Sequence, residues 1–116
     1  MDKISVYLVD DHQIILDGLK ALLGQDNVIE IAGEAIRCKD AFEMISICKP
    51  DVILTDIHLP DMNGIEFARL VKKSFPDIKI IALSMSADEA LISDMLDAGA
   101  SGYLVKNTGK EELREA

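Results

Sequence analysis

Five polar side chains stand directly after short apolar runs of the sequence. Asp10 and Asp11 follow the first run, Asp56 the third, Ser84 the fourth and Lys106 the fifth. Carboxylates held close together repel one another unless a cation neutralises them, and Mg²⁺, with Mn²⁺ as the alternative, prefers oxygen ligands. A hydroxyl and an ammonium group beside such a cation would suit a phosphoryl group. The pattern predicts that Asp56 is a nucleophile that forms an aspartyl-phosphate, provided that the fold brings the run ends together.

The segments that must position these residues alternate between strand and helix patterns. Apolar, β-branched runs predict strands over residues 4–9, 28–35, 52–55, 78–83 and 103–105. Helical spacing predicts helices over about 15–24, 39–48, 63–75 and 86–99, and a last helix from 108 that the sequence cuts off at 116. This alternation indicates an α/β fold of the (βα)5 type, a parallel sheet with helices on both faces. Ligands of such sheets bind at the carboxyl ends of the strands, where the five polar residues stand.

The helical segments also predict which side chains are buried and where the helices begin. The first helix is expected to bury Ile15, Leu19, Leu22 and Leu23 and to stop at Gly24. The second is expected to bury Phe42, Ile45 and Met44 and to be closed by Pro50. Capping boxes open the other three helices, at Asn63 with Glu66, Ser86 with Glu89 and Thr108 with Glu111.

Composition favours one acidic domain over residues 1–116. Hydrophobic residues make up 49% of the 116 residues, enough for a core without disulfides, and the formal net charge of −9 argues against direct DNA binding. No basic leader and no apolar run of about 18 residues is present, so neither a signal peptide nor a membrane span is expected. Cys38 and Cys48 would lie roughly 15 Å apart on one helix, too far for a disulfide. Two thiols suit a reducing cytoplasm.

Each candidate residue alone has an ordinary structural explanation. Asp11 could cap the first helix, Ser84 could bond to nearby backbone, and Lys106 could be a solvated surface charge. Polar residues of these types at four of the five predicted strand ends make a joint functional role the better explanation.

Four sequence blocks carry a family resemblance. They are Val9-Asp10-Asp11-His12, Thr55-Asp56-Ile57-His58-Leu59-Pro60-Asp61-Met62-Asn63-Gly64, Ala82-Leu83-Ser84-Met85, and Ala98-Gly99-Ala100-Ser101-Gly102-Tyr103-Leu104-Val105-Lys106. With these blocks, the chain resembles the receiver domain of two-component response regulators over essentially all of its length, and most closely the NarL/FixJ type. The resemblance implies a flavodoxin-like (CheY-like) sheet in the order 2-1-3-4-5.

The resemblance also implies roles for the residues around Asp56. Asp56 would take a phosphoryl group from a phosphohistidine of a sensor histidine kinase. Asp11 and Asp56 would bind Mg²⁺ directly, Asp10 directly or through water, and the backbone carbonyl of His58 would join them. Lys106 would pair with the phosphoryl oxygens.

A switch and an output are implied as well. Ser84 would move to the phosphoryl group and Tyr103 would turn inward behind it. The face built from the fourth helix, the fifth strand and the fifth helix would then change its partner preference. In the NarL/FixJ type a C-terminal helix-turn-helix domain follows, so DNA would be bound only through a domain absent from this sequence. Ile14 lies off the core stripe of the first helix, which suggests a contact in a homodimer or with another domain.

Several positions depart from the family pattern or border the site. Asn107 follows Lys106 where many receivers have proline, which affects the loop geometry only. Met85 stands where many receivers have a small residue and would narrow access to Asp56, or simply pack over the strand end. His58 and Ser86 border the route of hydrolytic water, so they are expected to tune the lifetime of the phosphoryl group.

Three other functions could use some of the same residues as a transcriptional receiver. A stand-alone receiver acting through protein contacts fits the same residues, whereas the complete acidic set argues against a pseudo-receiver that never takes phosphate. A phosphatase of the haloacid-dehalogenase type needs a second Asp two residues after the nucleophile, where His58 stands. The domain would catalyse its own phosphorylation and slow dephosphorylation without being a turnover enzyme.

Overall fold

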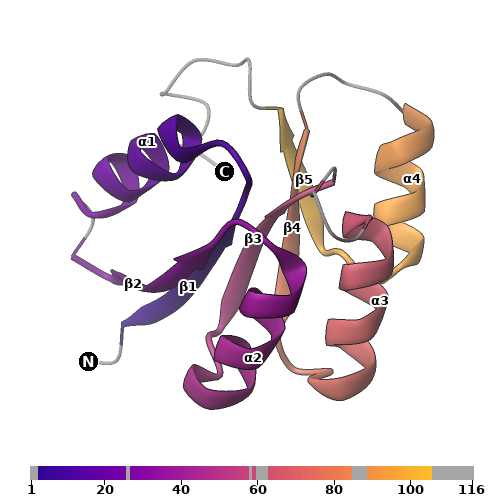
Figure 1. The fold of residues 1–116 in the computed structure, drawn as a ribbon, viewed down its shortest axis with the longest axis horizontal. Helices are drawn as coiled ribbons and strands as arrows, with labels where there is room; N and C mark the ends of the chain where they lie inside the picture. Colours follow the sequence, from indigo (N-terminus) through magenta and orange to yellow (C-terminus); the bar gives the residue numbers. More distant parts are fainter. Residues whose placement is uncertain (1–2, 26, 58, 60–62, 85–88, 106–116) are drawn as a thin grey trace.

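Strands and helices alternate along the described part of the chain (Figure 1). The computed structural model describes residues 3–25, 27–57, 59, 63–84 and 89–105. The elements are β1 Ile4–Val9, α1 Gln13–Leu23, β2 Ile29–Ala35, α2 Cys38–Cys48, β3 Val52–Asp56, α3 Gly64–Ser74, β4 Lys79–Ser84, α4 Glu89–Asp97 and β5 Gly102–Val105. All strand pairs are parallel and the order is β2-β1-β3-β4-β5, which confirms the predicted fold and strand order. The predicted helix from Thr108 lies outside the described residues.

The three central strands, β1, β3 and β4, bury side chains on both faces of the sheet. Tyr7 and Val9 of β1 belong to a large cluster with α2, α3 and α4, whereas Val6 and Leu8 belong to a smaller cluster with α1. Successive side chains of a strand point to opposite faces, so covering both faces requires an apolar residue at nearly every position. This explains why the strands appear in the sequence as continuous apolar runs.

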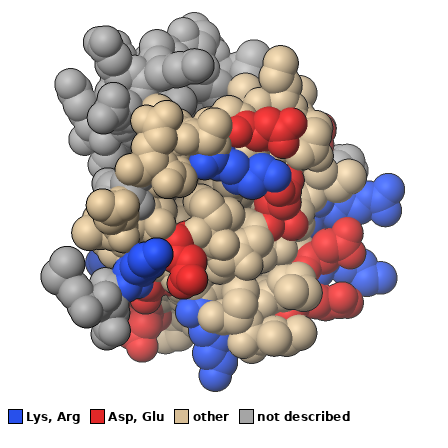
Figure 2. Space-filling model, turned by 90° about the vertical axis from the view of Figure 1, so that its left-hand side faces the viewer, with Lys and Arg blue, Asp and Glu red and all other residues tan. Residues whose placement is uncertain are grey.

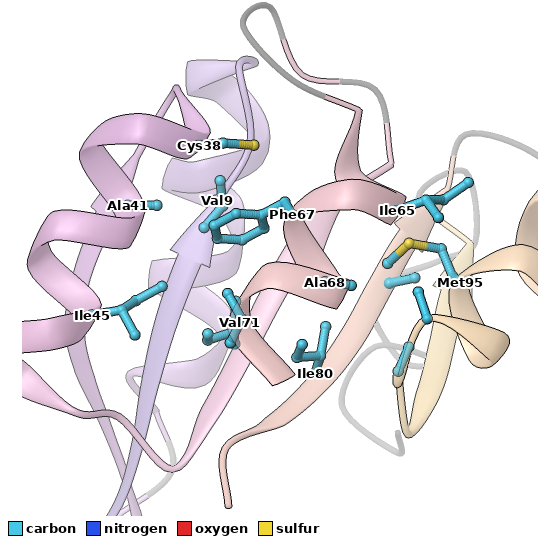
Figure 3. Close-up of a cluster of buried hydrophobic side chains, with 14 of the residues drawn as sticks. Val9, Cys38, Ala41, Ile45, Ile65, Phe67, Ala68, Val71, Ile80 and Met95 are labelled. Atoms are coloured by element: carbon cyan, nitrogen blue, oxygen red, sulfur yellow. The ribbon is translucent and has the colours of Figure 1, made fainter. Parts of the chain in front are cut away.

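The larger cluster fixes α2, α3 and α4 on one face of the sheet. In Figure 3 the Phe67 ring of α3 lies beside Val9 of β1, and Met95 of α4 lies near Ile65 of α3. Phe67 and Met95 are fully buried. The helices are therefore held close to the strands whose ends carry the acidic residues.

Two helix stripes differ in detail from the sequence prediction. In α1 the fully buried residue is Leu16, which the predicted stripe omitted, together with Leu19, while Ile15 packs from the edge. In α2 the buried residues are Cys38, Ala41 and Ile45, and the prediction that Met44 points inward is wrong because Met44 is 45% exposed. One residue along a helix turns the side chain by about 100°, so Met44 and Ile45 cannot both occupy the centre of the stripe.

The helix ends follow the predicted signals. The C-cap of α1 is Gly24, and α2 ends before Lys49, which has a left-handed backbone with φ of 44°. Asn63 is the N-cap of α3, although its side chain accepts the hydrogen bond of the Ile65 N–H at 2.8 Å instead of the N–H three residues on. Gly99, just beyond α4, has φ of 116°. No helix in the described ranges is long and apolar enough to cross a bilayer.

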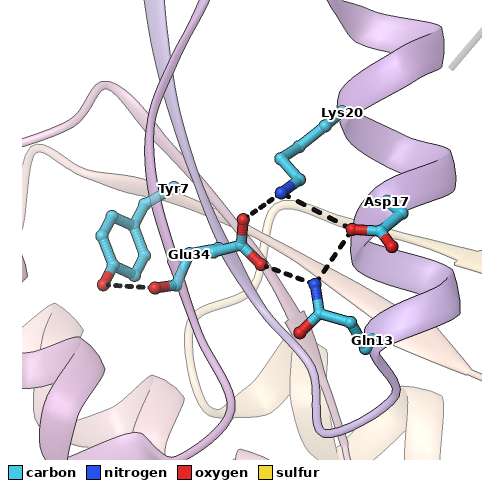
Figure 4. A network of polar contacts seen from close by, with 5 residues as sticks. All are labelled: Tyr7, Gln13, Asp17, Lys20 and Glu34. Carbon is cyan, nitrogen blue, oxygen red and sulfur yellow. Dashed lines mark hydrogen bonds and ion pairs between the residues drawn. The ribbon is translucent and has the colours of Figure 1, made fainter.

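A polar network fastens α1 to β2 (Figure 4). Lys20 of α1 forms an ion pair with Glu34 of β2 and lies 3.6 Å from Asp17, and the hydrogen bond from Lys20 to Glu34 raises the pKa of Lys20. The Gln13 amide donates to Asp17 at 2.9 Å and to Glu34 at 3.2 Å. Since Gln13 is the first residue of α1, the network holds the start of this helix against the sheet.

Tyr7 is buried where β1 meets an irregularity in β2. Its partner in β2 is Gly33, whereas Val6 pairs with Ile31, so one residue of β2 bulges. A Cβ at Gly33 would lie 2.8 Å from the Tyr7 ring, which explains the glycine. The Tyr7 hydroxyl donates to the Glu34 carbonyl at 3.3 Å. Burial, with Cys48, Asp40 and Glu34 nearby, raises the pKa of Tyr7 to about 12.

This pKa predicts a dependence of stability on alkaline pH. The folded state keeps Tyr7 neutral above pH 10, where the unfolded chain ionises, so its contribution is present below pH 10 and is lost as the pH rises towards 12. Urea unfolding over this range should show a fall in the free energy of unfolding that is about 1–2 kcal/mol larger for the wild type than for Tyr7→Phe. Tyr103→Phe, which leaves Tyr7 intact, should retain the full fall. Equal profiles for Tyr7→Phe and wild type would contradict the assignment.

Candidate metal centre

Two neighbouring strands deliver the buried acidic residues to one edge of the sheet. Asp10 directly follows β1, Asp56 is the last residue of β3, and these parallel strands pair side by side. Asp10 is 0% exposed and Asp56 is 3% exposed. The backbone N–H of Asp10 donates to the carbonyl of Ala35 at the end of β2, and the Thr55 hydroxyl donates to the Asp56 carbonyl, each at 3.1 Å.

Four side chains meet at this edge. One carboxylate oxygen each of Asp10, Asp11 and Asp56 and one ring nitrogen of His12 all lie within 4.8 Å of one another. Ligands at 2.0–2.6 Å from a shared hard cation lie no more than about 5 Å apart, so these donors fit one divalent ion. Carboxylate oxygens are ligands that suit Mg²⁺ and Mn²⁺. The predicted convergence of the three acidic residues is present in the structure.

His12 is the member of this group that the sequence prediction did not single out as a ligand. Its Nδ1 lies 2.9 Å from Asp10 Oδ1 and 3.1 Å from Asp11 Oδ1, and its backbone N–H donates to Asp10 Oδ1 at 2.9 Å. His12 is also the N-cap of α1, without a side-chain capping bond. Its place directly after the acidic pair, where the strand end turns into a helix, was the available signal.

Gly64 sets the position of the Asp56 backbone. Its N–H donates to the Ile57 carbonyl at 2.6 Å, and a Cβ at Gly64 would lie 2.3 Å from the Asp56 carbonyl oxygen and 2.8 Å from the Ile57 Cα. No side chain fits between these backbones, so the first residue of α3 must be glycine for the helix to approach β3 this closely. The close approach of α3 to the end of β3 therefore depends on a glycine at residue 64.

The remaining predicted residues are described only in part. Ser84 ends β4, whose Leu83 is level with Asp56 in the sheet, but its side chain lies outside the described part of the structure. Tyr103 of β5 is paired with Ala82 and is 47% exposed. The other predicted residues lie outside the described residues: Lys106, His58, Met85 and Ser86.

The opposite edge of the sheet contains a separate hollow. It is lined by the segments 49–51 and 74–78, which connect α2 to β3 and α3 to β4. These segments precede the strands, whereas the acidic group follows them. The hollow is therefore not part of the candidate metal centre.

Known sequences resemble this chain along nearly its whole length. Residues 6–116 match the family described as the response regulator receiver domain. The chain is 41% identical over 114 residues to the DNA-binding transcriptional activator DevR/DosR of Mycobacterium tuberculosis, covering 97% of this chain and 52% of that protein. It is 36% identical over 115 residues to the transcriptional regulatory protein DegU of Brevibacillus brevis, covering 99% and 49%. The chain thus spans about half the length of these curated relatives.

Solved structures share the fold. The signal receiver domain of the response regulator NarL from Mycobacterium tuberculosis superposes with a TM-score of 0.92 at 28% identity, covering 99% of this chain and 93% of that one. The isolated REC domain of RcsB from Salmonella enterica serovar Typhimurium, studied in the presence of the phosphomimetic BeF3-, gives 0.92 at 27% identity, covering 99% and 86%.

The close approach at Gly64 predicts a large effect of a single methyl group. Gly64→Ala should lower the free energy of unfolding by about 1–3 kcal/mol, because the backbone of Asp56 and Ile57 must move to admit the Cβ. Gly18→Ala in α1 is the matched control, since nothing lies within 4 Å of its Cβ position, and it should stabilise the helix by up to about 1 kcal/mol. Urea unfolding measures both. Similar effects of the two substitutions would contradict the steric role of Gly64.

Proposed function

The chain belongs to the response regulator receiver domain family, and we propose that Asp56 is its phosphoacceptor in a reaction that requires a divalent cation. The observation that carries the proposal is the convergence of Asp10, Asp11 and Asp56 within 4.8 Å at one edge of the sheet. Proteins of this family are generally not turnover enzymes. Mg²⁺ is the first candidate for the cation, and Mn²⁺ the second.

The acidic residues divide between binding the cation and accepting the phosphoryl group. Asp11 and Asp56 would hold the ion directly, Asp10 directly or through water, and the backbone carbonyl of His58 would complete the protein ligands. When bound, the ion neutralises charge on the carboxylates and on the phosphoryl oxygens. Asp11, at 37% exposure, is the carboxylate most open to solvent, whereas Asp10 is fully buried at the inner side of the site.

The group-transfer step balances without a further reactant. An oxygen of the Asp56 carboxylate forms a bond to phosphorus while the P–N bond of a phosphohistidine on a sensor histidine kinase breaks. The electron pair of the broken bond remains on the imidazole, which leaves as the neutral base when its other nitrogen carries a proton. Lys106 follows β5 directly, so its ammonium group would pair with the phosphoryl oxygens.

The response to phosphorylation would pass through β4 and β5. The Ser84 hydroxyl would bond to the phosphoryl group, and the space that it leaves would admit Tyr103, whose ring is 47% exposed. The surface of α4 and β5 would then change its partner preference. Phosphorylation can shift this equilibrium only through contacts that differ between the two states, and these two residues are the proposed source of that difference.

The lifetime of the phosphoryl group would depend on the residues at the rim. We assign this role to Met85, His58 and Ser86, which follow strands β3 and β4 closely in sequence. Slow autodephosphorylation by water would return the domain to its starting state. Tuning by side-chain bulk and polarity at these positions is consistent with a signalling module, in which the duration of the signal matters more than turnover.

The output would be the control of transcription through a separate DNA-binding region. The relatives named as transcriptional regulators are about twice the length of this chain, and the net charge here is −9. On the face shown in Figure 2, Lys and Arg are interspersed with Asp and Glu instead of forming one basic surface.

Ile14, 81% exposed on α1, would contribute to a homodimer or an interdomain contact. The two cysteine thiols favour a cytoplasmic location.

Intact-mass measurement after incubation with Mg²⁺ and acetyl phosphate tests the proposed reaction. The wild type should gain one phosphoryl group, and the gain should disappear with Asp56→Asn or with EDTA, because the nucleophile or the cation is then missing. Asp51→Asn, a conservative change of an exposed acid away from the site, should keep the adduct. A folded wild type that gains no adduct from an active donor would favour the docking-only pseudo-receiver, and an adduct on Asp56→Asn would place the phosphoryl group elsewhere.

A further inference from the structure

His12 occupies the candidate metal centre from a fixed position. Its backbone N–H donates to Asp10 Oδ1, and its carbonyl accepts the hydrogen bonds of Ile15 and Leu16 in the first turn of α1. The backbone is therefore held on both sides, by the end of β1 and by the start of the helix. The ring lies beside the carboxylates of Asp10 and Asp11, while its 51% exposure keeps it accessible to ions from solvent.

The contacts of the ring match the spacing of ligands around one ion. Neighbouring ligands of an octahedral ion with bonds of about 2.1 Å lie about 3.0 Å apart. His12 Nδ1 lies 2.9 Å from Asp10 Oδ1 and 3.1 Å from Asp11 Oδ1. Without an ion, the tautomer with its proton on Nδ1 can donate a hydrogen bond to these carboxylates. In the tautomer with its proton on Nε2, the lone pair of Nδ1 occupies the same place and can bind an ion. The ring is thus preorganised to exchange a hydrogen bond for a metal bond.

A nitrogen ligand changes which cation a site prefers. Mg²⁺ prefers carboxylates, carbonyls and water, whereas imidazole favours first-row transition-metal ions. From the position of the ring we propose that His12 is an inner-sphere ligand that raises the affinity of this site for transition-metal dications such as Mn²⁺ relative to Mg²⁺. This inference rests on the proposed function of the same site, because it presumes that Asp10, Asp11 and Asp56 bind a divalent ion.

Pulsed electron paramagnetic resonance of the Mn²⁺-loaded full chain provides a direct readout that does not depend on phosphorylation. The chain has two histidines, His12 and His58, so variants can assign a nitrogen signal. Protein labelled with ¹⁵N in the histidine rings should show a ring nitrogen coupled to Mn²⁺ in the wild type and in His58→Ala. The coupling should be lost in His12→Ala and in His12→Asn, the second of which retains a side chain that can cap α1.

The dissociation constants should change selectively. Loss of the nitrogen ligand should weaken Mn²⁺ binding by about 10-fold or more, with a smaller change for Mg²⁺, so the ratio of the two constants moves towards that of an oxygen-only site. Asp51→Asn, a change of an exposed acid at the opposite edge of the sheet, should leave the ratio close to the wild-type value. Calorimetric titration with each ion measures these constants, and circular dichroism confirms that each variant is folded.

The outcomes separate this inference from the proposed function. If the wild type binds Mn²⁺ and Mg²⁺ but the ring coupling is absent or survives in both His12 variants, His12 is not a ligand while the metal centre stands. Tighter binding of Mg²⁺ by His12→Ala would mean that the ring competes with the ion, which also overturns the inference. A wild type that binds neither ion would overturn the metal centre, and the inference with it.

Discussion

The close approach of two buried carboxylates is the constraint on which the site depends. Asp10 and Asp56 are at most 3% exposed, and a carboxylate oxygen of each lies within 4.8 Å of the other. Two like charges at this distance repel by about 3 kcal/mol at an effective dielectric constant of 20, in addition to the cost of removing each from water. A divalent cation reverses the sign of this interaction. The same arrangement that weakens the metal-free fold therefore prepares a strong cation site.

The rest of the fold holds the carboxylates where they would not otherwise stay. Both faces of β1 and β3 are covered, so the strands cannot slide apart without exposing the clusters around Phe67 and Leu16. Gly64 brings the start of α3 against the Asp56 backbone, and the Lys20–Glu34 ion pair keeps α1 against β2 behind His12. Most of these contacts are apolar or backbone contacts, which do not depend on the protonation of the site. Their free energy offsets the repulsion between the acids.

Sequence patterns were sufficient for the fold and for the three acids, but not for the finer geometry. Apolar runs and helical spacing identify strands and helices, and the rule that strand ends carry the chemistry then brings Asp10 and Asp56 together. Helical spacing identifies the apolar face of a helix but not which residue lies at the centre of that face. The sequence pattern therefore did not distinguish Ile45 from Met44 in α2, and it did not identify Leu16 as the most buried residue of α1. The position of His12 directly after the acidic pair was visible in the sequence, but the placement of its ring and the bulge opposite Tyr7 depend on tertiary contacts.

The free energy of unfolding of wild type and Asp56→Asn, each measured in EDTA and in saturating Mg²⁺, tests the repulsion between the buried carboxylates most directly. If repulsion between buried carboxylates dominates, Asp56→Asn should be more stable than wild type by about 1–3 kcal/mol in EDTA, since an amide of the same shape carries no charge. Mg²⁺ should stabilise the wild type more than the variant and so reduce or reverse the difference. A variant that is no more stable in EDTA, or a difference that Mg²⁺ leaves unchanged, would contradict the account.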